Sequence, residues 1–258
     1  MKWYSLTKLL LTIIALSPFY AVKGQDAPKG QLYLIHEDKV IPSKVTEYEG
    51  AAKGLADAFA KYTNGSLKYW VASRDDFSYI YVIPVGNYAG VDMVDNTFAE
   101  LSKAMGKEAM EATMKKFDGT FSTHRDYMVS FRADLSYLPD FPPENTFRHW
   151  DIYYLDPDKE TEAMAIAKEW KALFETKKIT SGYRFSIANI GLEPAFIVVL
   201  SGKNAADFYT QRQEVNKMLG EAGATLMQKT WTVVKRIDRK DGKLHLDLSF
   251  MPATTTKK

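Results

Sequence analysis

Six side chains are of types that bind small anionic or aromatic molecules: His36, Trp70, Arg74, Arg132, Arg184 and Ser186. Arginine binds planar anions such as carboxylates through parallel hydrogen bonds. A few polar groups that converge in an apolar hollow are the usual form of a small-molecule site. We therefore predict that these six residues bind a small apolar, aromatic or anionic ligand.

A plainer interpretation stays open for the same residues. The arginines could pair with Asp75, Asp76 and Asp134 across a sheet, and Trp70 could simply pack. A His beside two carboxylates, as in "HED" at 36–38, is also typical of a solvated strand end. The ligand site is therefore a hypothesis that depends on which way these side chains face.

Other chemistry is not indicated by the sequence. The chain has four histidines and no cysteine. No two histidines are three or four residues apart and HExxH does not occur, so no histidine metal site is predicted. The lack of cysteine excludes thiol catalysis, Fe–S clusters and cysteine zinc sites. GxSxG is absent too. We expect no metal and no cofactor, and a colourless purified protein.

The first 24 residues have the pattern of a secretory signal peptide. Lys2 and Lys8 precede an apolar run, and Val22 and Gly24 are small residues before a cut at Gln25. Removing this segment takes three lysines and no acids, so the formal net charge changes from +2 to −1. A nearly neutral chain gives no electrostatic reason to bind nucleic acid. We expect a secreted or periplasmic protein without an integral membrane segment.

A repeated phrase divides the chain into two halves. "ELSKAMG" at 100–106 returns as "EVNKMLG" at 214–220, and "YEGAAKGLADAFAKYT" at 48–63 faces "MAIAKEWKALFETKK" at 164–178. The pairing predicts an old internal duplication. It places Gly106 and Gly220 at a helix end or a close packing point, and Glu100 and Glu214 on exposed faces.

Each half reads as strand, helix, two strands, helix, strand. The expected strands are 32–36, 67–73, 79–85 and 125–134 in the first half, and 150–155, 182–188, 195–201 and 229–238 in the second. The expected helices are about 42–62, 96–117, 156–174 and 204–221. The segment 243–250 alternates and is predicted as an edge strand after a turn at "RKDG". This order is the ferredoxin-like β-α-β-β-α-β motif, with both helices on one sheet face.

The open faces of two such sheets can cover each other, which predicts an α+β protein with two tandem ferredoxin-like units packed sheet to sheet as an intrachain barrel. Strand alternation then sorts the side chains. The side chains that we expect to point toward the helices are Tyr69, Val71, Tyr127, Val129, Phe131, Tyr183, Phe185 and Ile187. Those that we expect to point into the barrel interior are Trp70, Ala72, Arg74, Met128, Ser130, Arg132, Arg184, Ser186 and Ala188. The faces of Tyr79 and Tyr81 are left open.

This element order resembles the dimeric α+β-barrel superfamily, including NIPSNAP-like and antibiotic-biosynthesis-monooxygenase-like domains. The resemblance implies a central cavity between two units, here within one chain, and therefore a monomer or weak dimer. The expected boundaries are a signal peptide at 1–24, a first unit at 25–138, a linker at 139–147, a second unit at 148–250 and a disordered tail at 251–258.

Three functions fit the sequence. The leading one is an exported protein that binds a small ligand between the two sheets. The second is a cofactor-poor monooxygenase or haem-handling enzyme of the same superfamily. The third is a structural scaffold for a protein partner, which predicts a barrel filled with side chains and an exposed apolar patch elsewhere.

Overall fold

The computed structural model describes residues 30–63, 65 and 67–252. The expected signal peptide at 1–24 and most of the expected tail lie outside these residues. No helix of the described part is long and apolar enough to cross a membrane.

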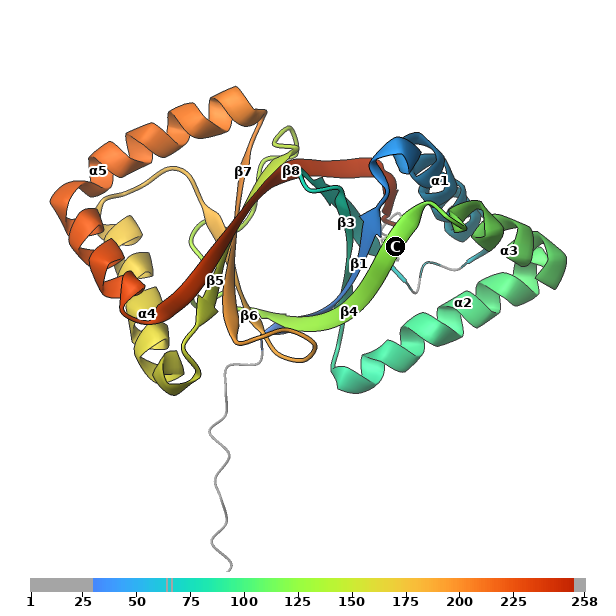
Figure 1. Cartoon of the computed structure of the whole chain (residues 1–258), viewed down its shortest axis with the longest axis horizontal. Helices are drawn as coiled ribbons and strands as arrows, with labels where there is room; N and C mark the ends of the chain where they lie inside the picture. The colour runs from blue at the N-terminus through green and yellow to red at the C-terminus, as the bar shows by residue number, and fades with distance from the viewer. Residues whose placement is uncertain (1–29, 64, 66, 253–258) are drawn as a thin grey trace, which may run out of the picture.

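The strands of the described residues form a closed antiparallel barrel in the order β1-β3-β2-β8-β5-β7-β6-β4 (Figure 1). Within this ring each half keeps the ferredoxin-like order, β4-β1-β3-β2 and then β8-β5-β7-β6. The eight strands are β1 Gln31–Val40, β2 Tyr69–Arg74, β3 Ser78–Val85, β4 Phe121–Phe131, β5 Phe147–Leu155, β6 Tyr183–Ala188, β7 Ala195–Gly202 and β8 Val234–Phe250. The predicted fold class, α+β with an intrachain barrel, is confirmed.

The helices cover the barrel on two opposite sides (Figure 1). One side carries α1 Val45–Tyr62, α2 Val91–Met105 and α3 Lys107–Met114, and the other carries α4 Glu160–Thr176 and α5 Ala205–Trp231. Four short 3-10 turns precede or follow these helices: η1 Pro42–Lys44, η2 Tyr88–Gly90, η3 Lys115–Phe117 and η4 Pro157–Lys159.

Buried apolar side chains form three layers that follow from strand alternation. One cluster lies between the first half's sheet and α1, with Tyr48, Phe59 and Leu101 almost fully buried. A second lies between the second half's sheet and α4 and α5. The third occupies the barrel interior and includes Trp150 and Ile197. The faces of Tyr79 and Tyr81, which the sequence left open, are toward the helices.

The repeated phrase marks equivalent breaks in the second helix of each half. Gly106 ends α2 with φ 89°, and Gly220 kinks α5 with φ 55°. Residues other than glycine rarely adopt these backbone conformations. Glu100 and Glu214 are exposed. The phrase is therefore part of the scaffold and lies away from the barrel interior.

The end of the chain differs from the prediction. Residues 229–231 belong to α5, and the two segments expected as separate strands form one long strand, β8. β8 pairs with β5 in its first part and with β2 in its last part, so it joins the two halves. "RKDG" does not form a turn and continues the strand. Its Gly242 pairs with β2 so closely that a Cβ atom would clash with the Ser73 carbonyl oxygen.

Candidate functional site

The barrel interior contains a cavity of about 340 Å³. Its walls come from strands of both halves, and the segment before β5 contributes Phe141, Pro142 and Pro143. Most of the lining is aromatic or branched apolar: Tyr33, Ile35, Trp70, Ile80, Val82, Tyr127, Val129, Phe131, Trp150, Ile197 and Val199. An apolar hollow with a few polar side chains is the usual form of a small-molecule site.

Four of the six predicted site residues line this cavity: Trp70, Arg74, Arg184 and Ser186. β2 and β6 are six-residue strands that alternate cleanly, with Tyr69, Val71, Tyr183 and Phe185 packed against the helices. Their other face therefore points into the barrel.

His36 does not line the cavity, which corrects the predicted site. On β1 the inward residues are Tyr33 and Ile35, so His36 faces outward beside Tyr81. Its Nδ1 lies 2.8 Å from Asp126 on β4, and its Nε2 lies 3.2 Å from Asp38. Burial would lower the pKa of His36, but the hydrogen bonds and charges of Asp38 and Asp126 raise that pKa to about 9.

Arg132 also lies outside the cavity, because the predicted faces of β4 are inverted. Tyr127, Val129 and Phe131 point into the barrel, while Met128 joins the helix-side core. Arg132 instead makes hydrogen bonds of 2.7 and 2.6 Å to Asp134. The plainer interpretation, a paired arginine, holds for this residue.

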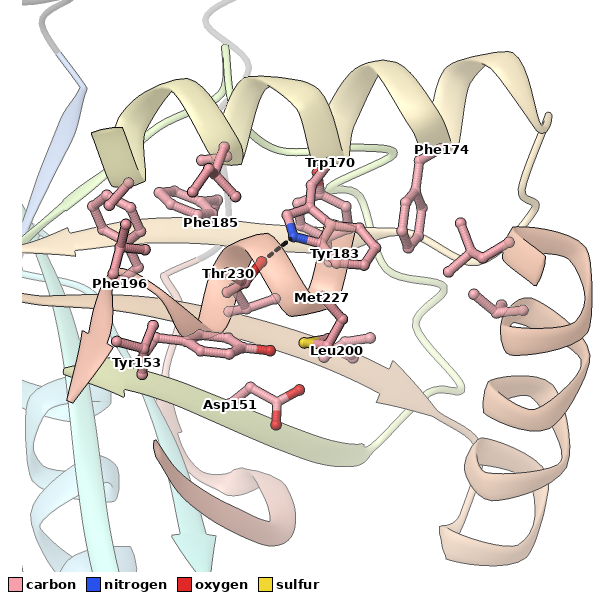
Figure 2. Close-up of a pocket in the computed structure, with 18 of the residues that line it drawn as sticks. Asp151, Tyr153, Trp170, Phe174, Tyr183, Phe185, Phe196, Leu200, Met227 and Thr230 are labelled. Carbon is pink, nitrogen blue, oxygen red and sulfur yellow. Dashed lines mark hydrogen bonds between the residues drawn. The ribbon is translucent and has the colours of Figure 1, made fainter. Parts of the chain in front are cut away.

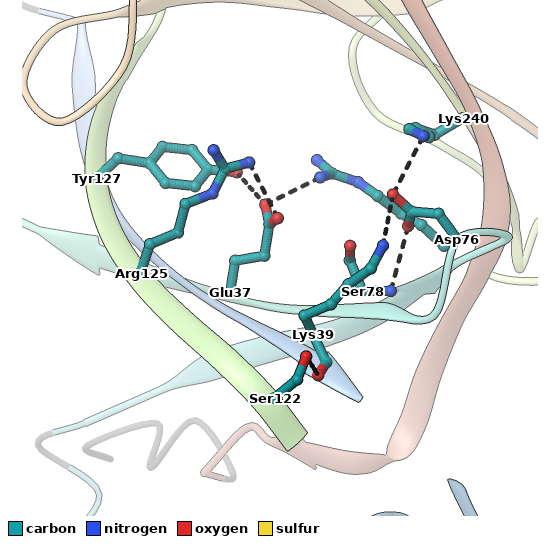
Figure 3. A network of polar contacts seen from close by, with 9 residues as sticks. Glu37, Lys39, Asp76, Ser78, Ser122, Arg125, Tyr127 and Lys240 are labelled. Carbon is teal, nitrogen blue, oxygen red and sulfur yellow. Dashed lines mark hydrogen bonds and ion pairs between the residues drawn. The ribbon is translucent and has the colours of Figure 1, made fainter. Parts of the chain in front are cut away.

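A polar network surrounds the largely buried side chain of Glu37, beside the cavity residues Arg74 and Tyr127 (Figure 3). Its carboxylate accepts hydrogen bonds from Arg74 at 3.1 Å, Arg125 at 3.0 Å and Tyr127 at 3.2 Å. Arg74 also lies 5.1 Å from the Trp150 ring, and its buried Nε has no hydrogen-bond partner among the described residues. Burial would lower the pKa of Arg74, but Tyr127 and Glu37 raise it and keep the guanidinium charged.

Asp76, one of the carboxylates that the sequence analysis considered as partners of the arginines, does not pair with Arg74. Asp76 pairs with Lys39 and Lys240, each at 3.1 Å (Figure 3). Arg74 takes Glu37 instead, because both side chains point into the barrel from strands on either side of β3.

Two arginines of the cavity lining lie close to one aromatic ring. The guanidinium of Arg148 lies 5.0 Å from the centre of the Phe141 ring, and that of Arg184 lies 5.1 Å from it. Arg148 was missed by the sequence analysis because the strand was expected to begin at 150. Extending the alternation back from Trp150 would have placed Arg148 on the inward face.

A second, smaller cavity of about 160 Å³ lies between the second sheet and its helices (Figure 2). Aromatic side chains such as Tyr153, Trp170 and Phe174 line it, and Trp170 donates a 2.9 Å hydrogen bond to Thr230. Two charged residues line it, Asp151 and Arg212, and they form an ion pair at 3.1 Å. The sequence analysis did not anticipate this cavity.

The outward His36 cluster has a counterpart in the second half. Nδ1 of His149 lies 2.6 Å from Asp241, the residue directly opposite it on β8. Nε2 of His149 lies 3.4 Å from Asp151, two residues further along β5. Both rings are therefore held by carboxylates on neighbouring strand positions, outside the barrel interior.

The described residues contain no group of three His, Asp or Glu side chains placed to hold a metal ion. No histidine lines either cavity. Tyr153 and Met227 of the smaller cavity are of types that can bind haem iron. However, burial raises the pKa of Tyr153 and keeps the phenol protonated, and methionine usually binds haem iron opposite a histidine.

Comparison with known proteins shows the fold. No protein-family model and no curated protein sequence matches the chain. An anthrone oxidase-like protein has a TM-score of 0.58 at 12% identity, over 84% of this chain and 92% of that one. A monooxygenase-like protein from Lactobacillus acidophilus NCFM has a TM-score of 0.54 at 11% identity, over 86% and 96%.

A mutant chlorite dismutase from Candidatus Nitrospira defluvii has a TM-score of 0.51 at 11% identity, over 84% of this chain and 93% of that chain. All three share the fold of this chain at low sequence identity. The resemblance noted from the sequence is thus confirmed at the level of the fold. Identities this low carry no residue of those proteins over to this chain.

Proposed function

We propose that this protein binds a small aromatic or apolar molecule inside the barrel. The observation that carries the proposal is the 340 Å³ cavity, whose walls include Trp70 and Trp150 and three arginines, Arg74, Arg148 and Arg184. Aromatic side chains offer large contact areas with defined ring geometry. A barrel that held only its own side chains would leave no such space, so the cavity favours binding over a purely structural role.

A pair of matched substitutions tests where the ligand binds. Ala72 is buried in the wall of the barrel cavity, and Ala167 is buried in the wall of the helix–sheet cavity. Ala72→Leu and Ala167→Leu each add the same volume to one cavity. The neutral dye N-phenyl-1-naphthylamine, which fluoresces strongly in apolar surroundings, reports binding.

We expect the wild type to bind the dye with a saturable signal, Ala72→Leu to weaken binding about tenfold or more, and Ala167→Leu to leave it unchanged. The opposite result would move the site to the helix–sheet cavity. Saturable binding that neither substitution changes would contradict a site in either cavity.

The second candidate function is an enzyme of the monooxygenase or haem-handling kind. The fold of the anthrone oxidase-like, monooxygenase-like and chlorite dismutase structures favours it, and so does the aromatic cavity around Trp170. The lack of a histidine at either cavity argues against haem in this chain. Adding haemin to the purified protein tests this: we expect no saturable Soret shift, and a sharp one would support the enzyme.

We also propose that the protein is exported, on the strength of residues 1–24. Mass determination of the protein recovered outside the cytoplasm should give a chain that begins at Gln25. A chain that still begins at Met1 would contradict export through cleavage of this segment.

A further inference from the structure

Arg148 and Arg184 differ from every other arginine of the chain. Six arginines have a carboxylate oxygen between 2.6 and 3.3 Å away: Arg74, Arg125, Arg132, Arg212, Arg236 and Arg239. Arg148 and Arg184 have none among the described residues, which include all eight arginines. Their hydrogen bonds go to backbone carbonyls instead, from Arg148 to Asn145 and Phe147 and from Arg184 to Pro139.

These two cations share one aromatic neighbour and one cavity. Both guanidinium groups lie within 5.1 Å of the centre of the Phe141 ring, and both residues line the cavity wall. Burial, and then the charge of Arg184, lower the pKa of Arg148 to about 10. Two like charges without an acid between them repel, and an anion bound to both relieves that repulsion. The arrangement is therefore complete only with a negative group that the described residues do not supply.

The rest of the cavity defines what carries this negative group. Besides the arginines, the walls are Trp70, Trp150 and other aromatic and branched apolar side chains. Arg74 already has a carboxylate neighbour in Glu37, which it shares with Arg125. A ligand with one anionic group and one apolar body thus matches this lining.

We propose that the ligand is a carboxylate on an aromatic or apolar body, and that Arg148 and Arg184 bind the carboxylate beside Phe141. This inference rests on the proposed function and names the class of molecule that the barrel accepts. Guanidinium groups match the planar, two-oxygen geometry of a carboxylate. The body of the ligand would then lie toward Trp70 and Trp150.

The test compares 2-naphthoate with 2-naphthamide, which has the same shape without the charge. We expect the wild type to bind naphthoate about tenfold or more tightly than the amide by calorimetry, since charge-assisted hydrogen bonds are stronger than neutral ones. This preference should shrink as salt is raised. Arg184→Gln, at an exposed position, and the double variant Arg148→Gln/Arg184→Gln should lower naphthoate affinity toward that of the amide, with amide binding unchanged.

Arg236→Gln is the matched control. Arg236 also stacks on an aromatic ring, at 3.7 Å from the centre of Tyr154, but it pairs with Glu193 and does not line the cavity. It should leave both affinities unchanged. Equal wild-type affinities for acid and amide would overturn the carboxylate inference and leave the barrel site standing. Binding of neither compound would overturn the proposed function as well.

Discussion

The guanidinium of Arg74 lies 3.1 Å from the carboxylate of Glu37, and the side chains of both residues are almost completely buried inside the barrel. The two residues come from β2 and β1, which both pair with β3. Their contact gives Arg74 a carboxylate partner inside the barrel, and Arg125 shares that carboxylate at 3.0 Å.

Replacing one member of this pair leaves the other charge buried alone. We expect Glu37→Gln to lower the free energy of unfolding by about 3 to 5 kcal/mol, as is typical when a buried ion pair loses one partner. Urea denaturation followed by circular dichroism measures this. Asp57→Asn, which breaks an exposed ion pair with Lys53, should change stability by no more than about 0.5 kcal/mol. Equal effects of the two substitutions would contradict the buried network.

The pH dependence of His36 follows from its two carboxylate neighbours. Its pKa is raised from 6.5 to about 9 in the folded protein, so the folded state holds the proton more tightly than the unfolded state. The stabilisation is full below about pH 6.5 and is lost as pH rises through about 9. Because a third of the side chain is exposed, solvent screening reduces the effect to the order of 1 kcal/mol.

NMR titration of the His36 ring gives this pKa directly. We expect a midpoint near 9 in the wild type, and a clearly lower one in Asp126→Asn, which removes the partner at 2.8 Å. His245 serves as an internal reference because burial lowers its pKa, opposite in direction to His36. A His36 midpoint near 6.5 would show that the carboxylates do not hold the ring as described.

Much of the fold could be predicted from the sequence because hydrophobic periodicity reveals each helix and strand from a short stretch of the chain, and the order of these elements indicates the motif. The helical spacing before Tyr62 and the alternation after Tyr183 each depend on a few neighbouring residues. β8 was missed because "RKDG" has turn chemistry, while its actual conformation is imposed by pairing with β2 and β5. Shared ancestry of the two halves stays a prediction.

The site was predictable only where the apolar face of a strand packs against the helices. β6 meets this condition, so Arg184 and Ser186 were placed correctly in the wall. The apolar face of β4, with Tyr127, Val129 and Phe131, points into the apolar barrel interior instead, and its predicted orientation was therefore inverted. Phe141 lies outside the strands, so no periodicity could assign it to the cavity.

The two helix breaks give a test of the scaffold. Gly220→Ala should destabilise the protein by about 1 to 3 kcal/mol, because a side chain at φ 55° and ψ −142° is strained. Gly50 is a matched control, since it lies within α1 with open space around its Cβ position. Gly50→Ala should stabilise by roughly 0.5 to 1 kcal/mol. Thermal denaturation measures both, and stabilisation by both would contradict the kink.

Binding inside the barrel is tested most directly by isoleucine methyl NMR during titration with 2-naphthoate. Ile35, Ile80 and Ile197 line the barrel cavity, and Ile166 lines the helix–sheet cavity. We predict saturable ring-current shifts at the first three methyl groups and none at Ile166. Shifts confined to Ile166, or no saturable shift at any of the four, would contradict a ligand site in the barrel.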